Sequence, residues 1–478
     1  MSVKPARDLR RYTGTIEAIG AFLGAVIAGL LLMAPLDVGA TTGPSFQLDL
    51  LVLNMPRAAA AGAVFAAVSA ALAIALGRRT AWVVAAGSSL VLLLDRLFTG
   101  QAVDNGNLTT VNYVDSIFSG ILLGALAVAV FGRRTATSAY LIGALGAILI
   151  GDQTSLPSDS GHEPLISWAA TASPPLWMYF LAVALLAAGL LLQRPASHHQ
   201  PNSDLPIGPI VAALLLVAAT ALSTEWVVRH AGTSKQVTIA AVITVAAAMV
   251  AALLLPGRDG MLVLLSVAVT NAGSAIIAVP RPEWSAPLPM IAVVAGLFAG
   301  RRRPLPWAAL WGTAGLSVFA ALTAGTAHGT ALVPVLGITV TALLVGYCFG
   351  TAVPRNAGSA VVAIAVLIVP CLVVALRGSS FGRIAYSPQW YRDPEGAASA
   401  APGWVALAVT LGCGLGMFIL YRLRTSPAVR SRIVARKSLP QAWIGRSRKS
   451  ESESGPASNL LLDLQRPKRA FTQLSASG

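Results

Sequence analysis

Polar and ionisable side chains are rare inside the apolar stretches of this chain, and the few that occur there are the first candidates for chemistry. Asn271 lies near the centre of an apolar stretch at 260–280, with Thr270 and Ser274 beside it. Amide and hydroxyl groups at that position can bind the polar part of a solute, or they can hydrogen-bond neighbouring helices. We predict that these residues line a substrate cavity, and interhelical hydrogen bonding stays open as the alternative.

Charged side chains occur only near the ends of the apolar stretches. Glu17 lies about one turn inside the first stretch. It can carry a proton or pair with an inner arginine, and we favour pairing because the position is shallow. Arg57, Asp95 and Asp115 lie near the outer ends of the second, third and fourth stretches. They are candidates for a gate of paired charges or for coupling, with snorkelling into lipid headgroups as the alternative.

The sequence contains no pattern for catalysis, a metal or a cofactor. Its three cysteines, at 348, 371 and 413, lack the paired spacing of a disulfide or a zinc site. Its five histidines are scattered without metal-ligand spacing, and no phosphate-binding Gly-x-x-x-x-Gly-Lys loop is present. We therefore predict no metal, no cofactor and no enzymatic activity.

The composition indicates what kind of protein carries these residues. Of the 478 residues, 55% are hydrophobic and 11% are charged, whereas a soluble domain has about 25% charged residues. The apolar stretches are continuous and rich in Ala, Leu and Gly, which is typical of helices. We predict an all-α polytopic membrane protein with about 14 transmembrane helices. The segments are 14–36, 56–76, 80–98, 114–131, 136–151, 173–193, 208–228, 237–256, 260–280, 286–300, 305–324, 331–350, 357–376 and 403–421.

The excess of basic residues follows from topology. The chain has 34 Lys and Arg against 19 Asp and Glu, for a net charge of +15. Basic residues stay on the cytoplasmic side of short loops, and they recur at every second turn if the N-terminus is cytoplasmic. Both termini are then cytoplasmic, and a nucleic-acid partner is excluded. We expect the serine-rich, basic segment 422–478 to be disordered and to attract anionic lipid.

A repeat relates two parts of the chain. The turn Gly77-Arg78-Arg79 recurs about 223 residues later as Gly300-Arg301-Arg302-Arg303, and Phe131-Gly132 recurs as Phe349-Gly350. Parallel six-helix repeats of this kind are a known transporter design. The predicted organisation is an N-terminal segment 1–13, a six-helix set 14–193, a linker 194–207, an inserted helix pair 208–256, a second six-helix set 260–421 and the tail 422–478.

This layout resembles the major facilitator superfamily, and in particular its fourteen-helix drug-exporter branch, which also inserts two helices between its halves. The hallmark of that branch is a Gly-x-x-x-Asp-Arg-x-Gly-Arg-Arg-type turn. Gly77-Arg78-Arg79 matches the end of the turn, and Gly296 to Arg303 matches its second copy loosely. The motifs are eroded, because the Asp is absent from both copies. The resemblance implies alternating access between two six-helix halves, and it places the helix that carries Asn271 at the substrate cavity.

We predict a secondary transporter that exports neutral, amphipathic or lipid-like solutes from a bacterium with a GC-rich genome, in whose plasma membrane it resides. The solute class follows from the lack of charge at the centre of the apolar stretches. Three alternatives stay open. They are a lipid-linked-sugar glycosyltransferase with Asp37 and Asp49 as candidate acids, a lipid flippase, and an assembly factor that does not transport. The sequence identifies no protein partner in the cell envelope.

Overall fold

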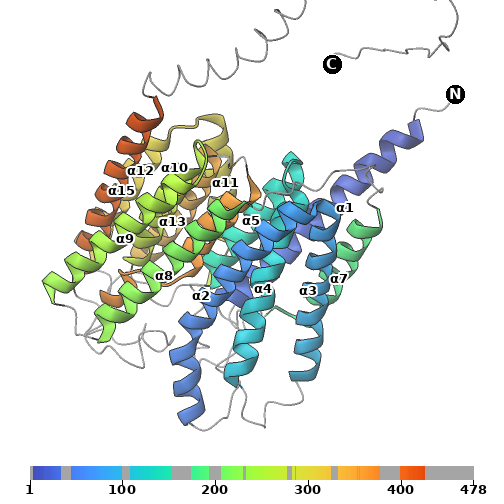
Figure 1. The fold of residues 1–478 in the computed structure, drawn as a ribbon, viewed down its shortest axis with the longest axis horizontal. Helices are drawn as coiled ribbons and strands as arrows, with labels where there is room; N and C mark the ends of the chain where they lie inside the picture. The colour runs from blue at the N-terminus through green and yellow to red at the C-terminus, as the bar shows by residue number, and fades with distance from the viewer. Residues whose placement is uncertain are drawn as a thin grey trace, which may run out of the picture. The chain divides into compact units, whose positions relative to one another are not determined.

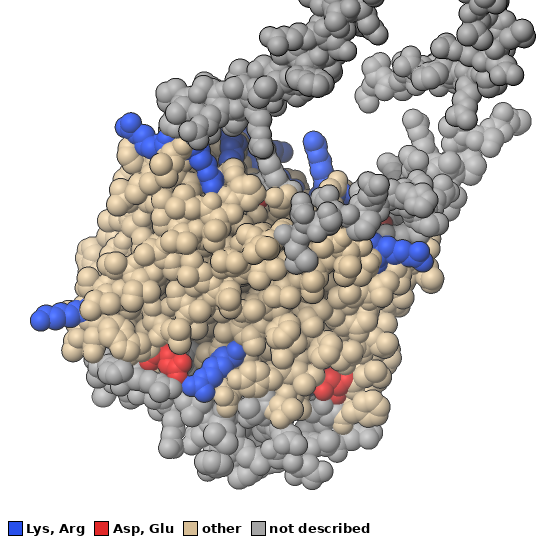
Figure 2. Space-filling view, in the orientation of Figure 1, with Lys and Arg blue, Asp and Glu red and all other residues tan. Residues whose placement is uncertain are grey.

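The fold is described by a computed structural model (Figure 1). The described residues are 4–33, 45–99, 108–151, 174–192, 206–229, 233–276, 283–285, 287–324, 332–352, 354, 356–376 and 399–425. This part of the chain holds fourteen α-helices and no strand, and nine of these helices are long and apolar enough to cross a membrane. On the face shown in Figure 2, charged side chains gather toward two ends of a broad uncharged band. The predicted all-α polytopic class is confirmed.

The described residues up to Leu420 belong to one compact unit. Several predictions fall outside the described residues. They concern the tail beyond 425, most of the linker 194–207, Asp37 and the side chain of Asp49. The orientation of the termini stays a prediction from charge.

Six helices make up the first set. They are α1 (Lys4–Met33), α2 (Ser45–Leu76), α3 (Arg78–Thr99), α4 (Leu108–Val130), α5 (Arg134–Gly151) and α7 (Leu176–Leu191). Helix α1 packs on α4, α5 and α7, α4 packs on α2 and α3, and α3 packs on α7. Gly77 and Gly132 both have a φ of +98°, a conformation that glycine adopts without steric cost. These residues let the α2–α3 and α4–α5 turns reverse the chain in very few residues.

The remaining helices comprise an inserted pair and a second set. The pair is α8 (Ile207–Arg229) and α9 (Ser234–Leu254). The second set is α10 (Asp259–Ser274), α11 (Leu288–Arg302), α12 (Pro306–Thr323), α13 (Leu332–Thr351), α14 (Ala357–Ile368) and α15 (Ala401–Thr425), with short 3-10 helices η3 (Glu283–Ser285) and η4 (Val374–Leu376). The two extra helices thus lie between the two sets in the chain.

The helix pairing of the first set recurs in the second. Contacts between helices of the second set correspond to contacts between helices of the first. The pair α11–α13 corresponds to α2–α4, α10–α14 to α1–α5, α12–α13 to α3–α4, and α10–α13 to α1–α4. Helix α15 follows the same rule, because Gly403 lies against Ala321 of α12 and Gly416 against Leu264 of α10. Its counterpart α7 likewise packs on α3 and α1. The observed contacts therefore repeat, while the boundaries of the predicted domains stay a prediction.

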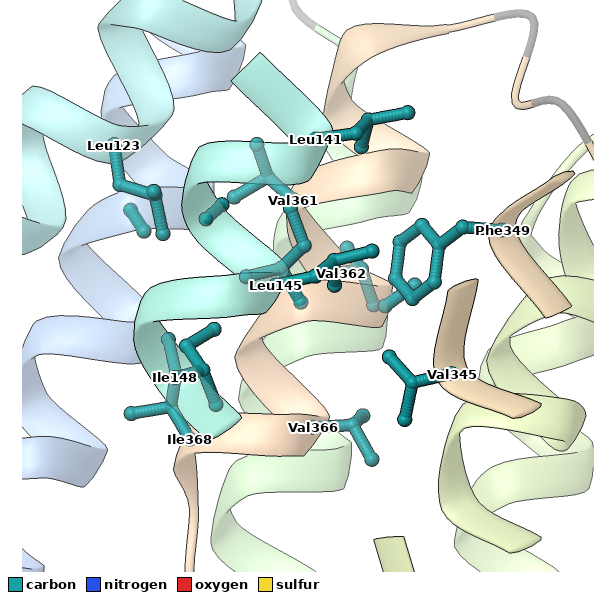
Figure 3. Packing of buried hydrophobic residues seen from close by; sticks show 14 of the residues in the cluster. Leu123, Leu141, Leu145, Ile148, Val345, Phe349, Val361, Val362, Val366 and Ile368 are labelled. Carbon is teal, nitrogen blue, oxygen red and sulfur yellow. The ribbon is translucent and has the colours of Figure 1, made fainter. Parts of the chain in front are cut away.

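The interface between the two sets has two-fold character. Helix α2 packs on α14 and α5 packs on α11, and these pairs exchange when one set is mapped onto the other. The pairs α4–α14 and α13–α5 exchange in the same way. Figure 3 shows the centre of the interface, where Leu145 and Ile148 of α5 share an apolar cluster with Val362 and Ile368 of α14 and Phe349 of α13. Buried apolar side chains fill this part of the interface.

Two helices of the second set end earlier than predicted. The apolar stretches run to 280 and 376, but α10 ends at Ser274 and α14 at Ile368. Pro370 has no backbone N–H and disfavours helix in the residue before it, so α14 cannot continue. At 1.5 Å per residue, Ser274 lies about 23 Å and Ile368 about 17 Å from the first residue of its helix. Both helices therefore end within the depth of a membrane whose apolar core is about 30 Å thick.

Candidate functional site

Glu17 is the centre of an ion-pair network at one end of the first set. Its carboxylate pairs with the guanidinium of Arg133, and Arg78 Nη2 lies 3.5 Å from the same carboxylate oxygen. Arg78 Nε also donates a 2.7 Å hydrogen bond to the carbonyl of Ala129. Glu17 is 3% exposed, while both arginines are partly exposed. The network joins α1 to the α2–α3 turn and to the α4–α5 turn.

This network bears on the turn that resembles the exporter hallmark. The turn lacks its own carboxylate, and α1 places Glu17 beside Arg78 instead. Pairing with an inner arginine, one of the two roles considered for Glu17, is therefore present in the structure. A role of Glu17 in coupling stays a proposal.

The second copy of the turn differs from the first in backbone conformation and in the contacts of its arginines. Gly77 takes a left-handed φ, whereas Gly300 lies inside α11, where a Cβ would come within 2.5 Å of the carbonyl oxygen of Tyr347. Arg301 Nη1 donates a 2.6 Å hydrogen bond to Ser138 Oγ of α5, so it links the two six-helix sets. The other arginines of the two turns are exposed: Arg79, Arg302 and Arg303.

Asn271, Thr270 and Ser274 lie at the end of α10. Asn271 is 1% exposed; its Nδ2 donates a 2.8 Å hydrogen bond to the carbonyl of Val267, and its Oδ1 has no partner among the described residues. Thr270 Oγ1 donates to the carbonyl of Ser266 in the same helix. The hydrogen bond of the Asn271 side chain stays within α10, so this side chain does not tie described helices together. Its Oδ1 is a buried acceptor that a solute hydroxyl or amide can reach only by displacing a neighbour.

The end of α14 meets the end of α10 at this point. Cys371 Sγ lies 3.9 Å from the carbonyl oxygen of Thr270 and donates to it. The carbonyl of Pro370 accepts a 3.3 Å hydrogen bond from Thr224 Oγ1 of α8. Interrupted helices at membrane depth are tolerated where protein buries the freed backbone groups, and in transporters they mark binding sites. The junction of α10 and α14 is therefore the candidate solute-binding site.

The structure brings two of the four predicted gate or coupling residues together. The side chains of Asp95 on α3 and Asp115 on α4 lie close enough to interact, and Arg96 and Tyr179 are their electrostatic neighbours. Asp115 is 8% exposed. Two neighbouring carboxyl groups can share one proton, because two negative charges would repel one another. This pair can therefore hold a proton inside the first set.

Arg57 lies elsewhere. Its Nη2 forms a 2.8 Å ion pair with Glu225 Oε1 of α8, and 53% of its side chain is exposed. Arg57 and Glu17 are thus not part of the Asp95–Asp115 pair. Sequence reasoning missed Glu225 because the inserted helices fall outside the repeat, although a lone acid inside the apolar stretch 208–228 is a visible signal.

A polar stripe on α4 was also missed. Asn112, Ser116 and Ser119 are at most 1% exposed. In the described part of the chain, the side-chain polar atoms of Asn112 and the hydroxyls of the two serines have no hydrogen-bond partner. Together with Asp115 they recur every three to four residues, which is the period of one helix face. Buried polar groups of this kind are usually satisfied by ordered water. The spacing in an apolar stretch could have revealed the stripe from sequence.

The Asp95–Asp115 pair gives a testable expectation. Asp115→Asn keeps a hydrogen-bonding side chain, whereas Asp115→Leu removes the partner of Asp95 at a buried position. We expect the leucine variant to lose about 1–3 kcal/mol of unfolding free energy and the asparagine variant less. Thermal unfolding in detergent measures the difference. Infrared spectroscopy should show a protonated-carboxyl band in the wild type that is absent from Asp115→Asn, and its persistence would mean that the proton is held elsewhere.

Fold and contacts together define a polytopic all-α membrane protein made of two related six-helix sets with a helix pair between them.

No known protein-family profile and no curated protein matches the chain. Two solved structures are similar to it. One is a crystal structure of an auto-inhibited POT family peptide transporter, 14% identical over 86% of this chain and 96% of that one, with a TM-score of 0.44. The other is an in meso crystal structure of the POT family transporter PepTSo, 16% identical over 86% and 97%, with a TM-score of 0.47.

Proposed function

We propose that the chain is a secondary membrane transporter that works by alternating access between its two six-helix sets. The observation that carries the proposal is the two-fold exchange of contacts across the interface, α2–α14 with α11–α5 and α4–α14 with α13–α5. Two packed bodies related in this way can rock about their common interface, so that either end opens while the other closes. The Arg301–Ser138 hydrogen bond is then a contact that forms and breaks with this motion.

The proposed solute is neutral, amphipathic or lipid-like, and the proposed direction is export. The support is the apolar centre of the interface in Figure 3 together with a buried polar acceptor, Asn271 Oδ1, near the end of α10. A charged solute would need compensating charges there, and burying an unpaired charge is costly. The resemblance to the drug-exporter layout supports the direction. Location in a bacterial plasma membrane, with anionic lipid at the basic tail, belongs to the same proposal.

A labelling experiment tests whether the interface opens. Single cysteines are introduced at Val362, buried between the sets, and at Val409, equally buried within the second set. The background replaces Cys348 and Cys413 with alanine and Cys371 with serine, which keeps a donor for Thr270. A water-soluble thiol reagent should label Val362→Cys in liposomes and leave Val409→Cys unlabelled. Equal protection of both positions would contradict alternating access.

A second candidate function is favoured by one observation. Buried Leu, Ile, Val and Phe side chains fill the centre of the interface, as expected for an assembly factor that no longer transports. Such a protein keeps its two sets permanently packed. The same experiment distinguishes the two functions, because an assembly factor predicts that Val362→Cys resists the reagent as Val409→Cys does.

A further inference from the structure

Helix α8 of the inserted pair lies across one side of the two-fold interface. It packs on α2 of the first set and also on α14 of the second (Figure 1). Ala63 of α2, Val217 of α8, and Ala365 and Val369 at the end of α14 form a separate buried apolar cluster. The seam between α2 and α14 is therefore covered by a third helix that contacts both of its sides.

Polar contacts hold α8 to each side of this seam. The Arg57–Glu225 ion pair of 2.8 Å ties α8 to α2. Thr224, the residue before Glu225, donates its hydroxyl to the carbonyl of Pro370, directly after α14. A hydroxyl that satisfies a carbonyl freed by proline is hard to remove at membrane depth, because no water replaces it there. Adjacent residues of α8 thus bind the two six-helix sets to one another.

The symmetry-related seam, between α5 and α11, has no such cover among the described helices. Helix α13 packs on both α5 and α11, but α4 packs on both α2 and α14 in the same way, so α13 is no counterpart of α8. The contacts noted across this seam are Met290 against Gly146 and the Arg301–Ser138 hydrogen bond. Behind the seam lie apolar side chains of the interface, including Leu141 and Leu145. The two seams are related by the repeat. They differ because α8 packs against both sides of the α2–α14 seam.

We infer that α8 keeps the α2–α14 seam closed, and that the two sets part laterally at the α5–α11 seam, which admits the alkyl chain of a lipid or lipid-like solute from the bilayer. This inference rests on the proposed function and specifies the route of its solute. An alkyl chain suits the seam because the contacts across it between described residues are apolar packing, as of Met290 on Gly146, and the Arg301–Ser138 hydrogen bond. The residues behind the seam then provide an apolar surface for the chain.

The inference is tested with an alkyl maleimide that partitions into the bilayer, in liposomes and on the cysteine-free background. Leu145→Cys reports on the α5–α11 seam and Ala365→Cys on the seam under α8, and both residues are at most 1% exposed in the closed structure. We expect Leu145→Cys to react at least about tenfold faster, since local opening free energies differ between parts of one fold. Equal rates, or faster reaction at Ala365→Cys, would overturn the inference.

The outcomes separate this inference from the proposed function. If the water-soluble reagent labels Val362→Cys but the alkyl maleimide does not favour Leu145→Cys, then the sets separate and the lateral route is wrong. If neither reagent labels Val362, Leu145 or Ala365 as cysteines, then the sets do not separate and the proposed function fails, and this inference with it.

Loosening α8 supplies a second measurement. The double variant Thr224→Val, Glu225→Leu removes the two polar contacts described above, those of α8 with Pro370 and Arg57. It should raise the labelling rate of Ala365→Cys toward that of Leu145→Cys. The matched control is Thr220→Val, one turn earlier, whose hydroxyl bonds only within α8 to the carbonyls of Leu216 and Val217. An unchanged rate at Ala365→Cys in the double variant would mean that α8 does not hold the seam.

Discussion

Replacing Gly120 with alanine should strongly destabilise the first six-helix set. Gly120 of α4 packs against Gly62 of α2, and a Cβ there would overlap the carbonyl oxygen of Gly62. Overpacking that side chains can relieve costs about 1–3 kcal/mol. Here the obstacle is backbone on both sides, so α2 and α4 must separate and lose buried contacts along their length. We expect a loss of about 3 kcal/mol, the upper end of that range, read from thermal unfolding in detergent.

A matched alanine should have the opposite effect. Gly87 of α3 is exposed, and nothing lies within 4 Å of a Cβ placed there. Because glycine in a helix interior costs roughly 0.5–1 kcal/mol relative to alanine, Gly87→Ala should be stabilising. In the second set, Gly346 of α13 packs against the carbonyl of Val293 of α11, and Gly346→Ala should be destabilising like Gly120→Ala. A Gly120→Ala protein that unfolds at or above the wild-type temperature would contradict the close approach of α2 and α4.

Removing the Glu17 carboxylate is also expected to be strongly destabilising. Glu17→Ala leaves Arg78 and Arg133 facing one another without the anion between them. Breaking a fully buried pair costs about 3–5 kcal/mol. The arginine side chains are 37% and 43% exposed, so solvent screens part of this cost. We expect a loss of about 1–3 kcal/mol.

A double-mutant cycle isolates the ion-pair contribution. Arg133→Gln in the Glu17→Ala background should cost less than Arg133→Gln alone, since the partner is already gone. Arg79→Gln is the control, because Arg79 belongs to the same turn, is exposed, and should change stability by no more than about 0.5 kcal/mol. Strict additivity of the Glu17 and Arg133 changes would show that the two residues act independently.

The helices were predictable because the signal for a membrane helix is local. An apolar stretch of about 20 residues has to satisfy its own backbone hydrogen bonds in a membrane, and each of the fourteen predicted stretches overlaps one described helix. The ends of α10 and α14 were not predictable from hydropathy, because Ala275, Ile276 and Cys371 are as apolar as the helices they follow. Pro370 was the available signal for α14, and no comparable residue marks the end of α10.

The candidate site was predictable only in part. The repeat pointed to Gly77-Arg78-Arg79 and its second copy, but it did not show that Arg78 meets Glu17 or that Arg301 reaches Ser138. Those contacts join residues 61 and 163 positions apart in the chain. A single sequence does not show which residues that far apart come into contact. The ion pair of Arg57 could not be predicted for the same reason. Its partner is on the inserted pair, which has no counterpart in the repeat from which a position could be inferred.

The position of Glu17 has a consequence for recognising related chains. A search keyed to an acidic residue inside the Gly-Arg-Arg turn will pass over any sequence in which the first helix contributes that carboxylate. The useful pattern is a pair of distant positions: an acid about one turn inside the first apolar stretch, and a basic residue directly after the glycine that ends the second. Asp259, buried at the start of α10, is the matching acid at the first helix of the second set. Chains that keep both acids, with or without an Asp in either turn, are the ones to compare with this protein.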